Sequence, residues 1–355
     1  MRIAIISPLD MRVPPVAYGG TELVVSLLTE GLVERGYDVT LFASGESITK
    51  AKLEPGCPRC VRGSNQNPQI LNMLNTVNCL QQANKFDIIH NHTLFEGMAT
   101  AGLVKTPMLT TLHGNIETDW RLMFERYAGW YNTISWACKG RLPEKDRFAG
   151  VVYNAIDVPS FPFNPSQREP HLLFLSRICL EKGTHLAIEV AKRCGRRLVI
   201  AGNVDIPDED YFRTTVLPHV DGDQIKYIGE ADYECKRDLL AAAHCLLAPI
   251  TWPEPFGLFM IEAMACGTPV IAFNNGAVPE VVRDEETGFV VDNLEEMVQA
   301  VDYVGEIDPR QCREHVERHF SASRMVNDYV KAYNKILSPV RENFREVDNS
   351  SPPVH

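Results

Sequence analysis

Two glutamates, Glu254 and Glu262, lie eight positions apart at the ends of a short apolar run in "EPFGLFMIEAMACGTPVIAF". If the backbone between them were helical throughout, eight residues would separate them by roughly 12 Å. Two carboxylates at that spacing could accept hydrogen bonds from hydroxyl groups at both ends of one extended ligand. The alternative is a structural pair, with one acid capping a helix and the other buried and paired. The spacing alone leaves both interpretations open.

A helix with a glycine at its start is expected between the two glutamates. Pro255 and Gly257 disfavour helix before Leu258, and Gly267 ends the helix that the pattern predicts over residues 258–266. Such a helix start leaves backbone N–H groups free to hold an anion, for example a diphosphate.

Two cations follow a predicted strand in "SRICLEKG". Arg177 and Lys182 are five positions apart, which places both at the carboxyl end of that strand. They could neutralise a phosphate, arginine as a planar fork and lysine as a point charge. Without further context, an exposed basic turn would explain them equally well.

Glycines and histidines mark the ends of strands in the first half of the chain. Gly19 and Gly20 precede a helix at Thr21 and would let the backbone approach a phosphate, although the full G-x-G-x-x-G pattern is absent and a plain tight turn is the alternative. His113 ends the strand "MLTTLH". His90 and His92 have a spacing that could also suit a metal, but no third ligand is evident and none is assigned.

Three further groups favour structural interpretations. Cys57 and Cys60 form a lone C-x-x-C in a loop, which we interpret as coincidental thiols in preference to a zinc or redox site. The acidic stretches Asp208–Asp210 and Asp221–Asp223 lie in polar segments typical of solvated loops. An aromatic-rich segment of the first half contains Trp120, Trp130, Tyr131 and Trp136. Core packing is its favoured role, and a surface that contacts the acceptor is the alternative.

Composition predicts two domains in a reducing compartment. The chain has 355 residues with 45% apolar content, more than one core usually covers. Its ten cysteines are scattered, mostly singly, which favours the cytoplasm over a disulfide framework. The start reads as a first strand and not as a signal peptide, and no 18-residue uncharged span is available to cross a membrane. The formal net charge of -11 falls entirely in residues 158–355, and the absence of a basic stripe argues against nucleic acid as a partner.

The same alternation of strands and helices occurs twice. The first half has the strand candidates "RIAIIS", "DVTLFA", "FDIIHN" and "MLTTLH", and the helical pattern "TELVVSLLTEGLVERG". The second half repeats the rhythm with "HLLFLS", "RLVIAG", "IKYIG", "CLLAPI" and "PVIAF". Apolar strands that alternate with helices indicate parallel sheets covered on both faces, with ligands at the carboxyl ends of the strands.

The predicted organisation is α/β, with two doubly wound Rossmann-like domains that face each other across a cleft. The first domain covers residues 1–157, and a proline-rich linker covers residues 158–170. The second domain covers residues 171–337, and its last helix is expected to pack back on the first domain. Residues 338–355 are expected to be disordered.

Several motifs together resemble the retaining glycosyltransferases of family 4, whose fold is the two-domain GT-B arrangement. The glutamates fit the E-x7-E motif of that family, and "GAVPEVV" and "ETGFVV" follow them. Upstream, "YGGTE", "DIIHNH", "TLHG", "YNAID", "SRICLEKG" and "IAG" stand in the order of the family. The resemblance runs from residue 1 to about residue 337.

The resemblance assigns a role to each matching residue. Glu254 would orient hydroxyls of the reacting sugar and stabilise positive charge at its anomeric carbon, and Glu262 would hold the ribose diol. His113 would contact the donor sugar near its 6-hydroxyl. Donor phosphates and sugar would be bound by two cations and by backbone groups: Arg177, Lys182, Gly19, Gly20, Phe256, Gly257 and Leu258.

The implied function is transfer of a hexose from a nucleotide diphosphate sugar to an acceptor hydroxyl with retention. UDP-glucose is the favoured donor and GDP-mannose stays open. No cofactor or divalent metal is expected, because two cations and a helix start already serve the diphosphate. His90 and His92 are expected to contact the acceptor, and a soluble acceptor is favoured over a membrane lipid. Two other classes stay open: a GT-B-fold sugar-nucleotide epimerase and a non-catalytic nucleotide-sugar-binding protein.

Overall fold

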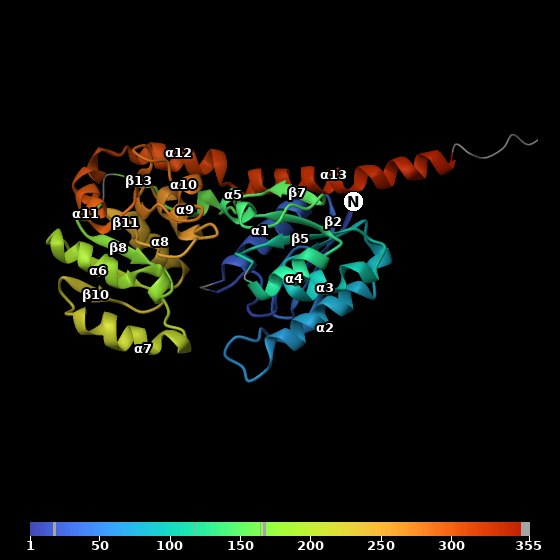
Figure 1. Ribbon diagram of the computed structural model, residues 1–355, viewed down its shortest axis with the longest axis horizontal. Coiled ribbons are helices and arrows are strands. Elements are labelled where there is room, and N and C mark those ends of the chain that lie inside the picture. Colours follow the sequence, from blue (N-terminus) through green and yellow to red (C-terminus); the bar gives the residue numbers. More distant parts are fainter. Residues whose placement is uncertain (17–18, 117, 164, 166–167, 349–355) are drawn as a thin grey trace, which may run out of the picture. The chain divides into compact units, whose positions relative to one another are not determined.

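The computed structural model describes residues 1–16, 19–116, 118–163, 165 and 168–348, in two compact units (Figure 1). Unit 1 comprises Met1–Ile134, Lys139–Tyr153 and the chain from Ala322 onward, and unit 2 comprises Ser135–Cys138 and Asn154–Ser321. Tyr18 of the "YGGTE" motif, residues 164, 166 and 167 of the expected linker, and residues 349–355 of the expected tail lie outside the described residues.

Unit 1 is built on a seven-stranded parallel sheet of order β3-β2-β1-β4-β5-β6-β7. The strands are β1 (Arg2–Ile6), β2 (Asp38–Ser44), β3 (Lys52–Cys57), β4 (Ile88–Asn91), β5 (Met108–Leu112), β6 (Trp130–Thr133) and β7 (Phe148–Val151). The accompanying helices are α1 (Gly20–Glu34), α2 (Pro68–Leu80), α3 (Phe95–Thr100), α4 (Thr118–Arg126) and α13 (Ala322–Asp348). The chain order of the strands reverses between β1 and β4.

Unit 2 is built on a six-stranded parallel sheet of order β10-β9-β8-β11-β12-β13. The strands are β8 (Leu172–Leu175), β9 (Leu198–Ala201), β10 (Ile225–Tyr227), β11 (Cys245–Ala248), β12 (Val270–Phe273) and β13 (Gly288–Val291). The helices are α6 (Thr184–Arg193), α7 (Glu209–Tyr211), α8 (Tyr233–Ala242), α9 (Leu258–Ala265), α10 (Val278–Val281), α11 (Leu294–Tyr303) and α12 (Pro309–His319). Helix α5 (Trp136–Gly140) crosses the division between the units.

Each unit has its own apolar core. In unit 1, Ile6, Phe42 and Ile89 of the central strands pack with other buried side chains in one cluster. In unit 2, Phe174 and Leu247 belong to the corresponding cluster. Because these strands are buried on both faces, they carry the continuous apolar runs that indicated parallel sheets. The predicted doubly wound α/β class is therefore confirmed for both units.

The predicted domain limits need two corrections. The described part of the expected linker, residues 158–170, belongs to unit 2, since the chain leaves unit 1 after Tyr153. The expected disorder from Ser338 onward is wrong for residues 338–348, which continue helix α13.

Helix α13 belongs to unit 1 and packs against α1. A Cβ built on Gly31 of α1 would lie 2.7 Å from Cγ2 of Val326, so the glycine permits this close approach. Arg35, at the end of α1, donates to the backbone oxygen of Ser323 at 3.0 Å and to Oδ1 of Asn327 at 3.0 Å. These contacts tie the C-terminal helix to the first helix of the chain.

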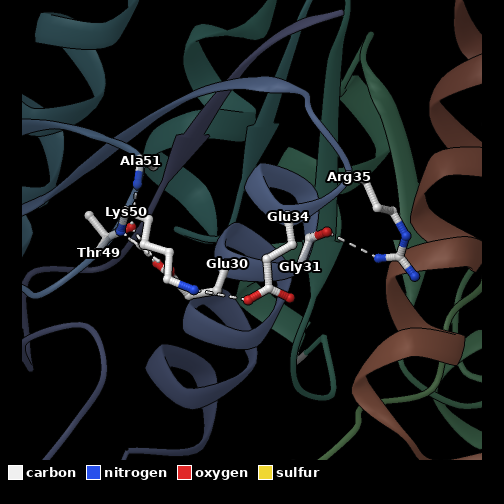
Figure 2. Close-up of polar contacts among 7 residues, drawn as sticks. All are labelled: Glu30, Gly31, Glu34, Arg35, Thr49, Lys50 and Ala51. Carbon is white, nitrogen blue, oxygen red and sulfur yellow. Dashed lines mark hydrogen bonds and ion pairs between the residues drawn. The ribbon is translucent and has the colours of Figure 1, made fainter.

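The other side of α1 is tied to the segment between β2 and β3, as Figure 2 shows. The carboxylate of Glu30 accepts from the hydroxyl of Thr49 at 2.5 Å and from the backbone N–H of Lys50 at 3.1 Å. The ammonium of Lys50 donates to Glu34 at 3.0 Å. Helix α1 is therefore held at both flanks, which fixes the direction in which its N-terminus at Gly20 points.

Candidate functional site

The candidate residues of unit 2 follow the two strands at the centre of its sheet. Strand β8 pairs with β9 on one side and with β11 on the other, so the chain order of the strands reverses between β8 and β11. Ligands of open α/β sheets bind outside the carboxyl ends of strands at such a point. Arg177 and Lys182 follow β8, and Glu254 follows β11.

Glu254 is buried and forms an ion pair with a lysine. Its Oε2 accepts from Nζ of Lys182 at 2.5 Å and from Nε1 of Trp252 at 2.9 Å. The side chain of Glu254 is 7% exposed and that of Lys182 is 11% exposed. The structure thus joins two residues that the sequence assigned separately to the sugar and to the diphosphate.

Two glycines permit the loop geometry around this pair. Gly183, which follows Lys182, has φ 74°, and a Cβ there would lie 2.1 Å from the backbone oxygen of Pro249. Gly276 has φ 61°, and a Cβ there would lie 2.3 Å from both N and O of Glu254. The next residue, Ala277, donates to the backbone oxygen of Glu254 at 2.8 Å. Only glycine fits these two positions, and neither was singled out from the sequence.

Glu262 lies inside α9 and forms an ion pair with a second lysine. Its Oε1 accepts from Nζ of Lys236 at 2.6 Å, and the Glu262 side chain is 5% exposed. Lys236 projects from α8, whose first turn is capped by Asp232 through the backbone N–H of Cys235 at 2.8 Å. Sequence reasoning missed Lys236, because the spacing of residues does not tell which neighbouring helix carries the partner of a buried acid.

Arg177 lies near two carboxylates, at longer distances than in the two glutamate–lysine pairs. Its guanidinium is 3.7 Å from Asp205 and 3.9 Å from Glu181, and its side chain is 32% exposed. Contacts at this length on a partly exposed side chain are weak. Asp205 is a further residue of this sheet edge that the sequence analysis did not name.

The start of α9 has the expected form. Gly257 is the N-cap residue with φ 84°, and no side chain of the described residues caps this helix. The predicted helix over 258–266 is confirmed as Leu258–Ala265. Phe256 is buried against Phe320, with ring centroids 5.7 Å apart, so only its backbone is suited to a ligand.

The structural alternative for the two glutamates, in which one caps a helix and the other is buried and paired, agrees with the structure in part. Both are buried and paired, but neither caps α9. Each lysine has three N–H donors and the contact to its glutamate accounts for one. The arrangement can therefore present both cations and carboxylates to a polar ligand.

In unit 1, Gly19 and Gly20 lie at the start of α1 and line a cavity of about 460 Å³. Gly19 is the N-cap residue with φ 149°, and a Cβ there would lie 2.7 Å from Cβ of Pro15. Asp10, Glu22 and Arg62 line the same cavity. Burial raises the pKa of Glu22 to about 7.

His113 and His92 form a bonded pair beside a second cavity of unit 1. Nδ1 of His92 and Nε2 of His113 are 2.8 Å apart, and both residues line a cavity of about 300 Å³. Burial lowers the pKa of His113 to about 4, and it lowers the pKa of His92 well below the usual value. Both rings are therefore neutral near pH 7.

The predicted acceptor contact of His90 does not fit the structure. His90 is fully buried, and its ring nitrogens bond the hydroxyl of Tyr333 and Oγ1 of Thr111, each at 2.7 Å. Helix α13 supplies Tyr333 from 243 residues away, a packing that no local pattern indicates. His90 is a structural residue of unit 1.

The remaining candidate groups, the two cysteines, the acidic turn and the aromatic residues, differ in their surroundings. Burial raises the pKa of both Cys57 and Cys60, and no metal-binding group of three or more His, Cys, Asp or Glu residues occurs in the described part of the chain. Asp221 accepts from the backbone N–H groups of Asp223 and Ile225 in an exposed turn. Core packing holds for Tyr131, whereas Trp136 is exposed and Trp120 lines the cavity of His113.

Comparison with known proteins agrees with this architecture. Residues 18–172 match the family described as Glycosyltransferase Family 4, and residues 159–318 match the family described as Glycosyl transferases group 1. Alpha-maltose-1-phosphate synthase of Mycolicibacterium smegmatis is 26% identical over 336 residues, covering 82% of this chain and 84% of the relative. No helix among the described residues has the length and apolar character needed to span a membrane.

Two solved structures share the fold. The structure of AviGT4, a glycosyltransferase involved in avilamycin A biosynthesis, superposes with a TM-score of 0.74 at 25% identity, covering 95% of this chain and 98% of that one. The structure of HepE of Anabaena in complex with UDP-glucose superposes with a TM-score of 0.72 at 18% identity, covering 96% and 100%. The chain therefore belongs to the glycosyltransferases, with a family 4 domain followed by a group 1 domain on the GT-B fold.

Proposed function

We propose that this glycosyltransferase moves a glucosyl group from UDP-glucose to an acceptor hydroxyl with retention of configuration and without a divalent metal. The observation that carries the proposal is the pair of buried glutamate–lysine contacts, Glu254 with Lys182 and Glu262 with Lys236, at one edge of the unit 2 sheet. Buried charges are usually paired. Each lysine here pairs with its glutamate and still has N–H groups that could donate to a ligand.

Each group has one role in donor binding. Glu262 accepts hydrogen bonds from the ribose diol, and Glu254 accepts from hydroxyls of the glucosyl group. The backbone N–H groups of Gly257 and Leu258, with Arg177 and Lys182, hold the diphosphate. Lys182 can keep its contact to Glu254 while its remaining N–H groups donate to a phosphate oxygen.

Catalysis depends more on how the substrates are positioned and on fixed charges of the protein than on a nucleophile that the protein supplies. A new bond forms between the acceptor oxygen and the anomeric carbon, while the bond from that carbon to the diphosphate breaks. The leaving diphosphate takes the proton of the acceptor hydroxyl on the same face of the sugar. Positioning and fixed charges of this kind are large contributors to catalysis.

UDP-glucose is the donor to test first, because HepE, a protein of this fold, has been solved with UDP-glucose. GDP-mannose is the second donor. The diphosphate needs no Mg²⁺ or Mn²⁺ in this proposal, since the two cations and the start of α9 supply the positive potential.

A thermal-shift panel of UDP, GDP, ADP and their sugars tests the donor assignment, since a ligand that binds only the folded protein raises its melting temperature. We expect UDP and UDP-glucose to give the largest shifts. Glu262→Ala should weaken UDP binding by about 1–3 kcal/mol, the scale of lost charged hydrogen bonds. Glu286→Ala, an exposed glutamate of unit 2, is the matched control and should bind UDP as the wild type does. Unchanged UDP affinity in Glu262→Ala would support the structural alternative.

A further inference from the structure

Two loops at the carboxyl edge of the unit 2 sheet are tied to each other through their backbones. The backbone N–H of Thr251, after β11, donates to the backbone oxygen of Glu181, after β8, at 2.8 Å, and the hydroxyl of Thr251 donates to the same oxygen at 3.2 Å. Glu181 directly precedes Lys182, and Thr251 closely precedes Glu254. The Lys182–Glu254 pair is therefore carried by two loops that are already bonded to each other.

The carboxylate of Glu254 receives both of its donors on one oxygen. Nζ of Lys182 donates to Oε2 at 2.5 Å, and Nε1 of Trp252 donates to the same oxygen at 2.9 Å. Oε1 accepts from no group of the described residues. A carboxylate has about four lone-pair sites, roughly two on each oxygen. The two donors use those of Oε2, so Oε1 is the oxygen left to bond a ligand.

The indole of Trp252 contacts both members of the pair. Its N–H donates to Glu254, and Nζ of Lys182 lies 5.4 Å from the centroid of its ring. The ring of Phe259 contacts the same ammonium, with its centroid 5.6 Å from Nζ. An ammonium within about 6 Å of an aromatic centroid is attracted to the face of the ring. Trp252 thus supplies one of two rings that hold Lys182, as well as a donor to Glu254.

A second donor restricts the rotation of the carboxylate. The last torsion of a glutamate side chain is broad, and the ammonium of a lysine moves on a flexible stem. A carboxylate that is held only by such an ammonium can turn about that torsion. The indole N–H is fixed in a planar ring, so its bond to Oε2 of Glu254 limits this movement.

The exposure of Trp252 shows which residue depends on the bond. Trp252 is partly exposed, so its N–H could bond water without a protein partner. It instead donates to a carboxylate whose side chain is 7% exposed. The bond therefore constrains Glu254 more than it satisfies Trp252.

We propose that Trp252 is a positioning residue for sugar transfer: its N–H fixes Oε2 of Glu254, so that Oε1 is the oxygen that bonds hydroxyls of the donor sugar. The inference rests on the proposed function, which assigns the sugar to Glu254 and the ribose to Glu262. The nucleotide is held by Glu262 and the start of α9 in that proposal. Loss of the indole N–H should therefore affect turnover more than UDP binding.

NMR of the indole groups tests the bond without any substrate. The chain has four tryptophans, and in protein that is isotope-labelled at the indole nitrogens the Trp252 signal is the one that disappears in Trp252→Phe. We expect this signal to move in Glu254→Gln, because its acceptor loses its charge, and to stay in Glu286→Gln, which changes an exposed glutamate of the same unit. Bound UDP-glucose should move the signal further than bound UDP does. A signal that keeps its position in Glu254→Gln, or that the two ligands move equally, would overturn the inference.

A kinetic double-mutant cycle tests the positioning role, with UDP release from UDP-glucose as the readout and water as the acceptor. Trp252→Phe keeps an aromatic face for Lys182 and removes the N–H. It should lower kcat about tenfold and leave both KM and the Kd for UDP within about twofold. In the Glu254→Gln background the same change should cost no further activity. Trp130→Phe, the same replacement at the first residue of β6, should turn over as the wild type does.

The cycle separates positioning from folding. A loss that came from misfolded protein would lower kcat equally in both backgrounds and would reduce the amount of UDP bound per chain. Equal losses in both backgrounds, or a larger change in KM than in kcat, would overturn the inference. If the wild type neither binds nor hydrolyses UDP-glucose, the proposed function alone fails, and the indole signal in Glu254→Gln still decides whether Trp252 holds the carboxylate.

Discussion

Each buried glutamate of unit 2 depends on its lysine. Removing one partner of a buried ion pair leaves an unpaired charge, which typically costs about 3–5 kcal/mol, whereas replacing both partners can be nearly neutral. Lys182 and Glu254 therefore act as a unit whose stability is greatest when both are present or both are replaced.

A double-mutant cycle tests this dependence. Lys182→Met should lower the free energy of unfolding by about 3–5 kcal/mol. The double variant Lys182→Met/Glu254→Gln should lose less than the sum of the two single variants, with a coupling of about 0.5–3 kcal/mol. Chemical denaturation of the four proteins gives the values. Strictly additive losses would show that the 2.5 Å contact contributes nothing to folding.

The hydrogen-bonded pair of His92 and His113 predicts a pH dependence of stability. Burial lowers the pKa of His113 from the usual 6.5 to about 4, so between these values the unfolded chain binds more protons than the folded protein does. Stability should thus fall as the pH drops from about 6.5 towards about 4, with no further loss from this group below that. Urea unfolding across this range, compared between wild type and His113→Gln, isolates the contribution. Parallel pH profiles of the two proteins would count against it.

Residue types and spacing could single out the glutamates, the two cations and His113 as candidates, because strand ends and helix starts are local features, while their roles came from the family resemblance. The same reasoning could not find Lys236 or Asp205, since their contacts come from elements that meet only in the fold. It also placed His90 wrongly. That side chain bonds Tyr333 of α13, and nothing near His90 in the sequence indicates that partner.

At the scale of elements, helix α13 closes the core of unit 1 with a buried polar network. Oγ1 of Thr111 donates to Oδ1 of Asn132 at 2.7 Å, so it must accept from Nε2–H of His90. Nδ1 of His90 is then an acceptor and the hydroxyl of Tyr333 donates to it. Tyr329, one turn earlier in α13, lies 3.2 Å from the same threonine oxygen.

Tyr333→Phe should destabilise unit 1 because it leaves Nδ1 of His90 buried without a donor. The expected loss is about 1–3 kcal/mol in the free energy of unfolding, measured by guanidinium denaturation. Tyr303→Phe, at an exposed position of α11, is the matched control and should lose little. Equal midpoints for both variants would show that the network does not hold the helix.

Most strands of both sheets could be predicted from short, largely apolar segments that alternate with helical patterns. Four strands were not predicted: β3, β6, β7 and β13. Strand β3 contains Pro55 and Gly56, residues that are depleted in strands, and it lies at an edge of its sheet. The other three are four residues long and include glycine or polar side chains, so their pairing depends on the neighbouring strand.

At the scale of the whole molecule, the alternation of strands and helices was sufficient to predict two doubly wound units. The last helix was expected to pack back on the first domain, and α13 lies in unit 1, whereas no pattern indicated that Ser135–Cys138 would lie in unit 2. The segment Ser135–Cys138 is held by hydrogen bonds within unit 2. An example is the carboxylate of Glu280, which accepts from the backbone N–H groups of Trp136 at 2.8 Å and Ala137 at 2.7 Å.

The central claim is retaining transfer from a nucleotide sugar without a divalent metal. Proton NMR of UDP-glucose with the protein, with the methyl glycosides of glucose, mannose, galactose and N-acetylglucosamine as acceptors and with excess EDTA, tests it most directly. We predict an α-configured glycoside as the first product, with UDP released in equal amount. Formation of a β-configured glycoside, release of an isomerised UDP-sugar, or turnover that only Mg²⁺ or Mn²⁺ restores would contradict it.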